Sequence, residues 1–189
     1  MKRFLFTIVM FAAIAAVVGC SKRERWDEKE RREVRDEVRA YRDMVYLENL
    51  ADAEFDAFSG DVVEAIEIDY PVYTTFVELP GKGDTVEIYV VSTIVNELNA
   101  DAHNMRNIYP YPWLVAEGIL PSGLDNQAQR AFYDCFARKV RGYYPSTEAF
   151  FEAIVNDDPS TSKLTQFQRD CAADLFDWNI TIDETLFFD

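Results

Sequence analysis

The first 20 residues constrain the fold most, because they separate a short leader from the rest of the chain. Lys2 and Arg3 make a positively charged start, and residues 4–18 form an uncharged, mostly apolar run of 15 residues. In a helix this run would reach only about 22 Å, which is short of the roughly 30 Å hydrocarbon core of a bilayer. Such an order is typical of a secretory signal peptide rather than of a spanning helix. We therefore expect residues 1–19 to be removed, which leaves 170 of the 189 residues for the folded body.

Small and aliphatic residues stand directly before the first cysteine, in the order Val17-Val18-Gly19-Cys20. This segment resembles the lipobox of bacterial lipoproteins, and the resemblance covers residues 1–21. It implies cleavage before Cys20, attachment of diacylglycerol to its sulfur, and acylation of the new amino group by a fatty acid such as palmitate. Two or three acyl chains hold a protein stably at a membrane, whereas one chain holds it only marginally. The alternative is an ordinary secreted protein in which Cys20 happens to follow the cleavage site.

The residue after the cysteine bears on which membrane the anchor would enter. In lipoproteins of bacteria with two membranes, an aspartate at this position tends to retain the protein in the inner membrane. This chain has Ser21 there. The resemblance therefore implies the outer membrane, facing the periplasm. We expect the membrane itself as one partner and an envelope protein or a glycan as another.

Charge is distributed unevenly along the body. Residues 22–42 carry nine basic and seven acidic side chains, a balance of +2, whereas residues 43–189 carry eight basic and 27 acidic ones, a balance of −19. Phosphate contacts need clustered Lys and Arg, so we expect no nucleic-acid partner. An apolar content of 49%, with 14% aromatic residues, predicts a folded domain with a core.

The sequence pattern predicts an α+β fold that begins with a long helix. Residues 20–59 are expected to form a lipid-anchored helical stalk, in which apolar residues recur at helical spacing from Val34 to Val45. This stripe predicts docking of the stalk on the body, with a coiled-coil dimer as the alternative. Gly60 is expected to end the helix and to open a globular domain over residues 60–189.

A β-hairpin is the next expected element. Residues 72–79 place alternate side chains on one face, and residues 85–95 are dense in β-branched side chains. The connecting residues 80–84 include two glycines, which can adopt positive φ in a tight turn. Because two strands are marginal alone, the hairpin is expected either to pack on helices or to gain a third strand from residues 179–188.

Several helices are expected to follow the hairpin. The first covers residues 124–141, the second runs from an N-cap at Ser146 to about residue 156, and the third runs from a cap at residues 160–162 to about residue 178. Cys135 and Cys171 lie on the apolar stripes of the first and last of these helices. If Cys20 is lipidated, they can pair only with each other. A bridge closing about 37 residues would stabilise the fold by roughly 3–4 kcal/mol. The alternative is two buried free thiols.

Side chains suited to catalysis are few in this sequence. His103 is the chain's one histidine, and no serine stands in a nucleophile-elbow pattern. Triad chemistry is therefore not expected, and neither is a zinc site with the usual ligands, so we expect no metal and no cofactor. Carboxylates are abundant, which leaves a carboxylate-dependent hydrolase as an alternative.

Five aromatic residues form the candidate ligand-binding set. The first three alternate with prolines, which favour extended backbone at the residue before them. Their flat rings could line a groove on which sugar rings or a peptide stack, with core packing as the alternative. The set comprises Tyr109, Tyr111, Trp113, Tyr143 and Tyr144. The sequence thus predicts a lipid-anchored envelope protein with a non-catalytic binding or assembly role, or alternatively a glycan-binding accessory lipoprotein.

Overall fold

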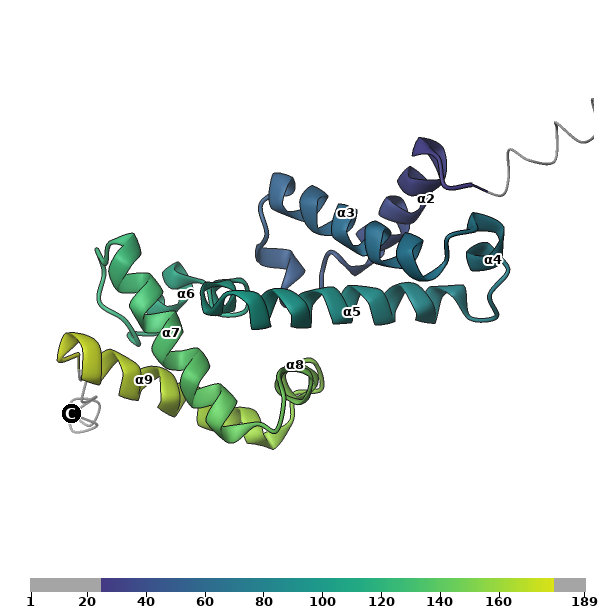
Figure 1. The fold of residues 1–189 in the computed structure, drawn as a ribbon. Helices are drawn as coiled ribbons and strands as arrows, with labels where there is room; N and C mark the ends of the chain where they lie inside the picture. The colour runs from purple at the N-terminus through teal and green to yellow at the C-terminus, as the bar shows by residue number, and fades with distance from the viewer. Residues whose placement is uncertain (1–24, 179–189) are drawn as a thin grey trace, which may run out of the picture. The chain divides into compact units, whose positions relative to one another are not determined.

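The computed structural model describes residues 25–178, and this range contains helices and no strand (Figure 1). The predicted α+β class is wrong, since the fold is all-α. Unit 1 comprises residues 25–42 and Asp52–Val91, and unit 2 comprises Asp43–Ala51 and residues 92–178. Between residues 25 and 178, no helix combines the length and the apolar content needed to span a membrane.

The first helix of unit 1, α2 (Glu28–Val38), is capped by Asp27, whose side chain accepts hydrogen bonds from the backbone N–H groups of Lys29 and Glu30. Two short 3-10 helices follow it, η1 (Arg39–Tyr41) and η2 (Leu47–Asn49). The predicted continuous helix over residues 20–59 is therefore wrong. The apolar stripe does begin where expected, because Val34 and Val38 are fully buried in unit 1.

Helix α3 (Asp52–Asp69) runs straight through Gly60, where the sequence predicts a helix end. Glycine inside a helix costs only about 1 kcal/mol relative to alanine, and the buried face of α3 outweighs that cost. This face consists of Phe55, Phe58, Val62, Val63 and Ile66. Helices α2 and α3 pack against each other (Figure 1). Arg31 of α2 donates two hydrogen bonds of 2.9 Å each to the Glu67 carboxylate of α3.

The predicted β-hairpin is two helices, α4 (Tyr73–Val77) and α5 (Lys82–Ala100). Gly81 at the turn does adopt positive φ, at 76°. The residues of the second expected strand are buried with a helical repeat of four that continues beyond it, because Val86, Val90, Ile94 and, past the expected strand, Leu98 are at most 1% exposed. Burial along one helix face therefore overrides the β propensity of the branched side chains.

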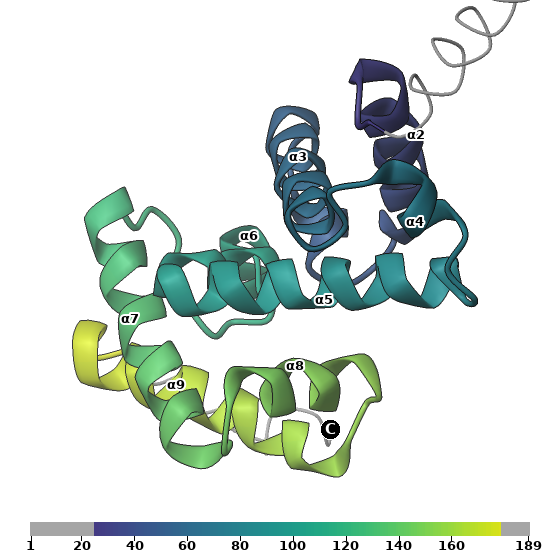
Figure 2. The ribbon, with the colours of Figure 1, turned by 45° about the vertical axis from the view of Figure 1, so that its right-hand side comes forward.

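An aromatic cluster connects the start of the described chain to α4. The Trp26 indole N–H donates to the carbonyl oxygen of Tyr70 at 2.7 Å. Its ring lies 5.0 Å from the Tyr73 ring and 5.7 Å from the Phe76 ring, measured between centroids. Phe76 is fully buried. This cluster holds α4 beside α2 (Figure 2).

Unit 2 is built from the segment Asp43–Ala51, which contains η2, from the second half of α5 and from the elements that follow α5. Asp125 and Ser146 cap α7 and α8, where their side chains accept the N–H groups of Ala128 at 2.8 Å and Ala149 at 3.2 Å. The prediction of an N-cap at Ser146 is confirmed. The predicted third strand, residues 179–188, lies outside the described residues. The elements are η3 (Ala102–Asn107), α6 (Tyr111–Ala116), α7 (Asn126–Tyr143), α8 (Thr147–Val155), η4 (Pro159–Thr161) and α9 (Ser162–Phe176).

Candidate functional site

A disulfide joins the two longest helices of the C-terminal part of the chain. Cys135 of α7 and Cys171 of α9 have an S–S distance of 2.05 Å and a Cα–Cα distance of 5.9 Å. Helices α7 and α9 pack against each other (Figure 2). Cys171 is fully buried and Cys135 is half-buried, so this bond is a structural link between helices. The predicted lipid site, Cys20, lies outside the described residues.

Tyr111, one of the candidate ligand-binding aromatics, is engaged in a backbone bridge. Its hydroxyl donates to the carbonyl oxygen of Pro121 and accepts the N–H of Leu124, each at 2.9 Å. These two bonds fix the loop that leads into α7. The polar end of Tyr111 therefore serves the fold of unit 2.

Tyr109 and Trp113 lie close together but differ in exposure. The Tyr109 ring lies 5.8 Å from the Trp113 ring and 5.5 Å from the Phe136 ring, between centroids. Burial raises the pKa of Tyr109, and the charge that the Tyr144 phenol can carry raises it further. Trp113 is 42% exposed. Tyr109 is thus half-buried against Phe136, and Trp113 presents part of its ring on the surface.

Tyr143 and Tyr144, at the end of α7, also differ in exposure. Tyr143 is 45% exposed, whereas Tyr144 is 8% exposed. The Tyr144 hydroxyl shares a hydrogen bond of 3.1 Å with the Ser160 hydroxyl. Tyr144 also lines a shallow cavity of about 310 Å³ with Ala149, Glu152, Ala153, Asn156, Asp158 and Ser160. The five predicted aromatics therefore contribute to several local structures rather than to one stacking platform.

His103 occupies a packing position. The Asp101 carboxylate caps η3 and accepts the backbone N–H of His103 at 2.9 Å. The imidazole lies edge-on to the Tyr133 ring, with 5.4 Å between centroids. Burial lowers the pKa of His103, and the nearby Arg106 and Arg130 cations lower it further. The side chain is therefore neutral near pH 7.

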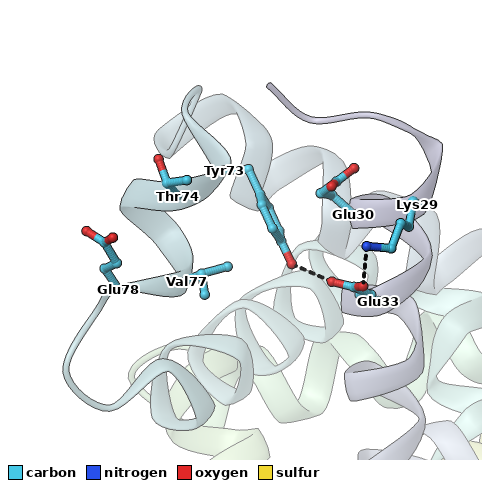
Figure 3. Close-up of a pocket in the computed structure, with 7 residues that line it drawn as sticks. All are labelled: Lys29, Glu30, Glu33, Tyr73, Thr74, Val77 and Glu78. Atoms are coloured by element: carbon cyan, nitrogen blue, oxygen red, sulfur yellow. Dashed lines mark hydrogen bonds and ion pairs between the residues drawn. The ribbon is translucent and has the colours of Figure 1, made fainter. Parts of the chain in front are cut away.

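The site with the most distinctive chemistry is a cavity of about 280 Å³ in unit 1 (Figure 3). The first turns of α2 form one wall, and α4 forms the other. Three carboxylates and one ammonium face this cavity, so its lining is acidic. We call this site the α2–α4 pocket, and its lining residues are Lys29, Glu30, Glu33, Tyr73, Thr74, Val77 and Glu78.

Glu33 is the carboxylate of the pocket that has local partners. The Tyr73 hydroxyl donates to Glu33 Oε2 at 2.9 Å, and the Lys29 ammonium lies 3.4 Å from Oε1 (Figure 3). The hydrogen bond from Tyr73 lowers the pKa of Glu33, and Lys29 lowers it further. In turn, burial and the bond to Glu33 raise the pKa of Tyr73. Glu33 is therefore ionised, and its charge is already compensated, at neutral pH.

Glu30 is different, because it is 9% exposed and its Oε2 atom has no hydrogen-bond partner in the part of the chain that the structure describes. Figure 3 shows its carboxylate in the upper part of the pocket, apart from the Tyr73–Glu33–Lys29 interactions. Burial of an unpaired charge or polar group costs free energy that a bound partner can recover. Glu30 is therefore the group in this pocket that most needs a ligand.

The α2–α4 pocket is not predicted from the sequence, because residues 22–33 are expected in a helical stalk and residues 72–79 in a strand. One available signal was Trp26, a large aromatic residue within an otherwise polar segment. A tryptophan in such a segment indicates that the adjoining helix has a face to bury. No cluster of three or more His, Cys, Asp or Glu suited to a metal ion occurs among residues 25–178.

Comparison with protein-family models, with curated proteins and with solved structures finds no match. The chemistry of the α2–α4 pocket is therefore inferred from its own residues.

Proposed function

We propose that this protein is a lipid-anchored component of the bacterial cell envelope with a non-catalytic binding or assembly role. One observation carries the proposal: a positive start, a short apolar run and small residues lead directly to Cys20. The Cys135–Cys171 disulfide supports it, because such bonds persist in oxidising compartments such as the periplasm. Ser21 favours the outer membrane over the inner one.

The binding part of the proposal is supported by the α2–α4 pocket. It combines a concave surface with a buried carboxylate oxygen that lacks a partner among the described residues. The non-catalytic part is supported by His103, whose neutral ring is packed against Tyr133 rather than beside a nucleophile. An anchored protein of this kind would hold its partner near the membrane.

Mass spectrometry of the protein extracted from its native membranes tests the anchor. We expect the chain to begin at Cys20 and to carry a diacylglycerol and an additional acyl group. The matched control is Cys20→Ser, which removes the acceptor sulfur and should leave the protein unlipidated and absent from the membrane fraction. An unmodified Cys20, or a leader that is still attached, would contradict the proposal.

The glycan-binding alternative is favoured by Trp113, which is 42% exposed and lies 5.8 Å from the Tyr109 ring. An exposed indole can stack on a sugar ring. Titration of the full chain with envelope polysaccharide, followed by tryptophan fluorescence, tests it. Binding that is lost in Trp113→Ala but kept in Trp178→Phe would favour this alternative, and an unchanged affinity in Trp113→Ala would remove it.

A further inference from the structure

We propose that the α2–α4 pocket binds a lysine side chain of a polypeptide partner, with the lysine ammonium paired to the Glu30 carboxylate. The inference rests on the proposed binding role and names the chemical group that is bound. Four features of the pocket support it: the state of Glu30, the charge of the lining, the size of the cavity and the position of the Tyr73 ring.

The state of Glu30 provides the first argument. Its side chain lines the cavity, is nine-tenths buried, and keeps Oε2 without a hydrogen-bond partner among the residues that the structure describes. An ionised carboxylate in such a place is costly unless a cation or a donor reaches it. This carboxylate is nine-tenths buried, which suits the compact ammonium of lysine, because an ammonium acts as a point charge. Arginine would instead use both oxygens of a carboxylate in a bidentate pair.

The remaining charges of the pocket also favour a cation. Lys29 is the cation in the lining, and it lies 3.4 Å from Glu33, which also accepts the Tyr73 hydroxyl. That pairing leaves the negative charges of Glu30 and Glu78 without an equal positive charge in the lining. Glu78 is exposed at the end of α4, where it can attract a cation before contact.

The size of the cavity favours a small ligand group. Pockets for drug-sized ligands usually enclose about 300–1,000 Å³. The α2–α4 pocket has about 280 Å³, which suits one long side chain better than an oligosaccharide. Val77 is 41% exposed and Thr74 is half-buried, so the opening offers some apolar surface to the methylene stem of a lysine.

The Tyr73 ring supplies an aromatic wall. Its hydroxyl is fixed by Glu33 at 2.9 Å (Figure 3). The Trp26 ring packs against the Tyr73 ring, with 5.0 Å between the ring centroids. A ring held in this way is pre-organised, and an ammonium over an aromatic face gains attraction from the π electrons. Because Trp26 touches Tyr73, occupation of the pocket should alter the environment of the Trp26 indole.

Nuclear magnetic resonance of the full chain in detergent tests the inference, with the Trp26 indole signal assigned through Trp26→Phe. The probe is Nα-acetyl-lysine amide, and the uncharged comparison is Nα-acetyl-norleucine amide, which has a similar stem without the ammonium. We expect saturable shifts of the Trp26 signal with a Kd on the order of millimolar for the lysine probe. The norleucine probe should give no saturable shift. Absence of binding by the lysine probe, or equal binding by both probes, would overturn the inference.

Two variants locate the binding. Glu30→Gln keeps the shape of the side chain but removes its charge, and it should weaken binding of the lysine probe at least about tenfold. The matched control is Glu64→Gln, an identical change at an exposed position of α3, which should leave the affinity within about twofold. Val77→Trp fills the pocket from its exposed rim and should block binding even if Glu30→Gln perturbs α2. Unchanged affinity in Glu30→Gln, or in a folded Val77→Trp, would place the binding elsewhere and overturn the inference.

Putrescine, a free diamine, separates a polypeptide lysine from a small metabolite as the source of the ammonium. We expect it to bind no tighter than the lysine probe, and tighter binding would overturn the assignment to a polypeptide. Failure of this inference can be separated from failure of the proposed function. A lipidated Cys20 without lysine binding would reject only the pocket assignment. Lysine binding with an unmodified Cys20 would reject only the location.

Discussion

Unit 1 and unit 2 are both helical, but different interactions stabilise them. In unit 2 a disulfide joins Cys135 of α7 to Cys171 of α9, within an interior rich in aromatic side chains. The described part of unit 1 contains no cysteine, and α2 is tied to α3 by the bidentate Arg31–Glu67 pair. The stability of unit 2 therefore depends on the redox state of its cysteines, whereas the stability of unit 1 depends more on charge.

The two units also differ in where they leave polar groups without partners. In unit 1 the buried polar atoms without a partner among the described residues include Oε2 of Glu30, which lines a cavity open to a ligand. In unit 2 both amide atoms of Gln168 lack a partner among the described residues, and this side chain is fully buried on α9. The arrangement at Glu30 is suited to binding a ligand. The buried amide of Gln168 instead lowers the stability of the fold.

Removal of the disulfide should have the largest effect and should fall on unit 2. The two cysteines are 36 residues apart, so loop-closure entropy predicts a loss of about 4 kcal/mol in the free energy of unfolding. Hydrogen exchange measured with and without reductant should therefore show lost protection in α7 and α9. Protection in α2 and α3 should change much less.

The double variant Cys135→Ala, Cys171→Ala is the control for this experiment. It should reproduce the effect of the reductant and should show no further change when reductant is added. Equal loss of protection in both units would contradict the proposed difference between them. Alkylation of two thiols in protein taken from native cells without reduction would show that the bond is absent there.

A pair of substitutions on α5 tests the helix that replaces the predicted strand. Ile88 and Val90 are two residues apart, so a strand would place them on one face, whereas a helix separates them by about 200°. Val90 is fully buried and Ile88 is 63% exposed. We expect Val90→Ala to cost about 2 kcal/mol in chemical denaturation and Ile88→Ala to stay within about 0.5 kcal/mol. Similar costs at both positions would contradict the helix.

The same helix shows why part of the fold could not be predicted from the sequence. The start of α8 at Ser146 was predictable, because a cap is a local signal that the backbone N–H of Ala149 satisfies at 3.2 Å. The segment from Thr85 to Val95 carries two competing signals, β-branched composition and a helical repeat of buried positions. Tertiary packing decides between them, and packing is not visible in a single sequence.

The candidate site was less predictable than the fold. Tyr109 and Trp113 were expected to act together, and they do lie 5.8 Å apart, but Tyr111 instead bonds to the backbone at Pro121 and Leu124. The α2–α4 pocket needs residues 40 or more positions apart, such as Glu33 and Tyr73. No local pattern specifies such a pairing once one wall is taken for a stalk and the other for a strand.

Replacement of the buried amide in unit 2 should raise stability. Gln168→Met keeps a similar length while it removes two buried polar atoms that lack partners among the described residues. We expect a gain of about 1 kcal/mol in the free energy of unfolding, measured by chemical denaturation. Gln166→Met is the control, because Gln166 is exposed and donates to Asp170 at 2.6 Å, and it should give no gain. A clear loss in Gln168→Met would mean that an internal water satisfies the amide.

The smallest expected change in the free energy of unfolding concerns the Arg31–Glu67 ion pair of unit 1. The hydrogen bond from Arg31 lowers the pKa of Glu67, so the folded protein holds this proton less readily than the unfolded chain. The Arg31–Glu67 pair therefore stabilises the folded protein fully above the unfolded pKa of about 4.3. This stabilisation is lost as the pH falls through the lower pKa that Glu67 has in the folded protein. Because both side chains are about one-third exposed, we expect Glu67→Gln to cost only about 0.5–1 kcal/mol at pH 7.

Denaturation of wild type and Glu67→Gln across pH measures this contribution directly. The difference between the two proteins should be constant above about pH 5 and should disappear below the folded pKa, where wild-type Glu67 is protonated. Glu64→Gln, on the exposed side of the same helix, should show little difference at any pH. If the Glu67→Gln difference persisted in acid, the side chain would be stabilising unit 1 through packing, and charge would not distinguish this unit from unit 2.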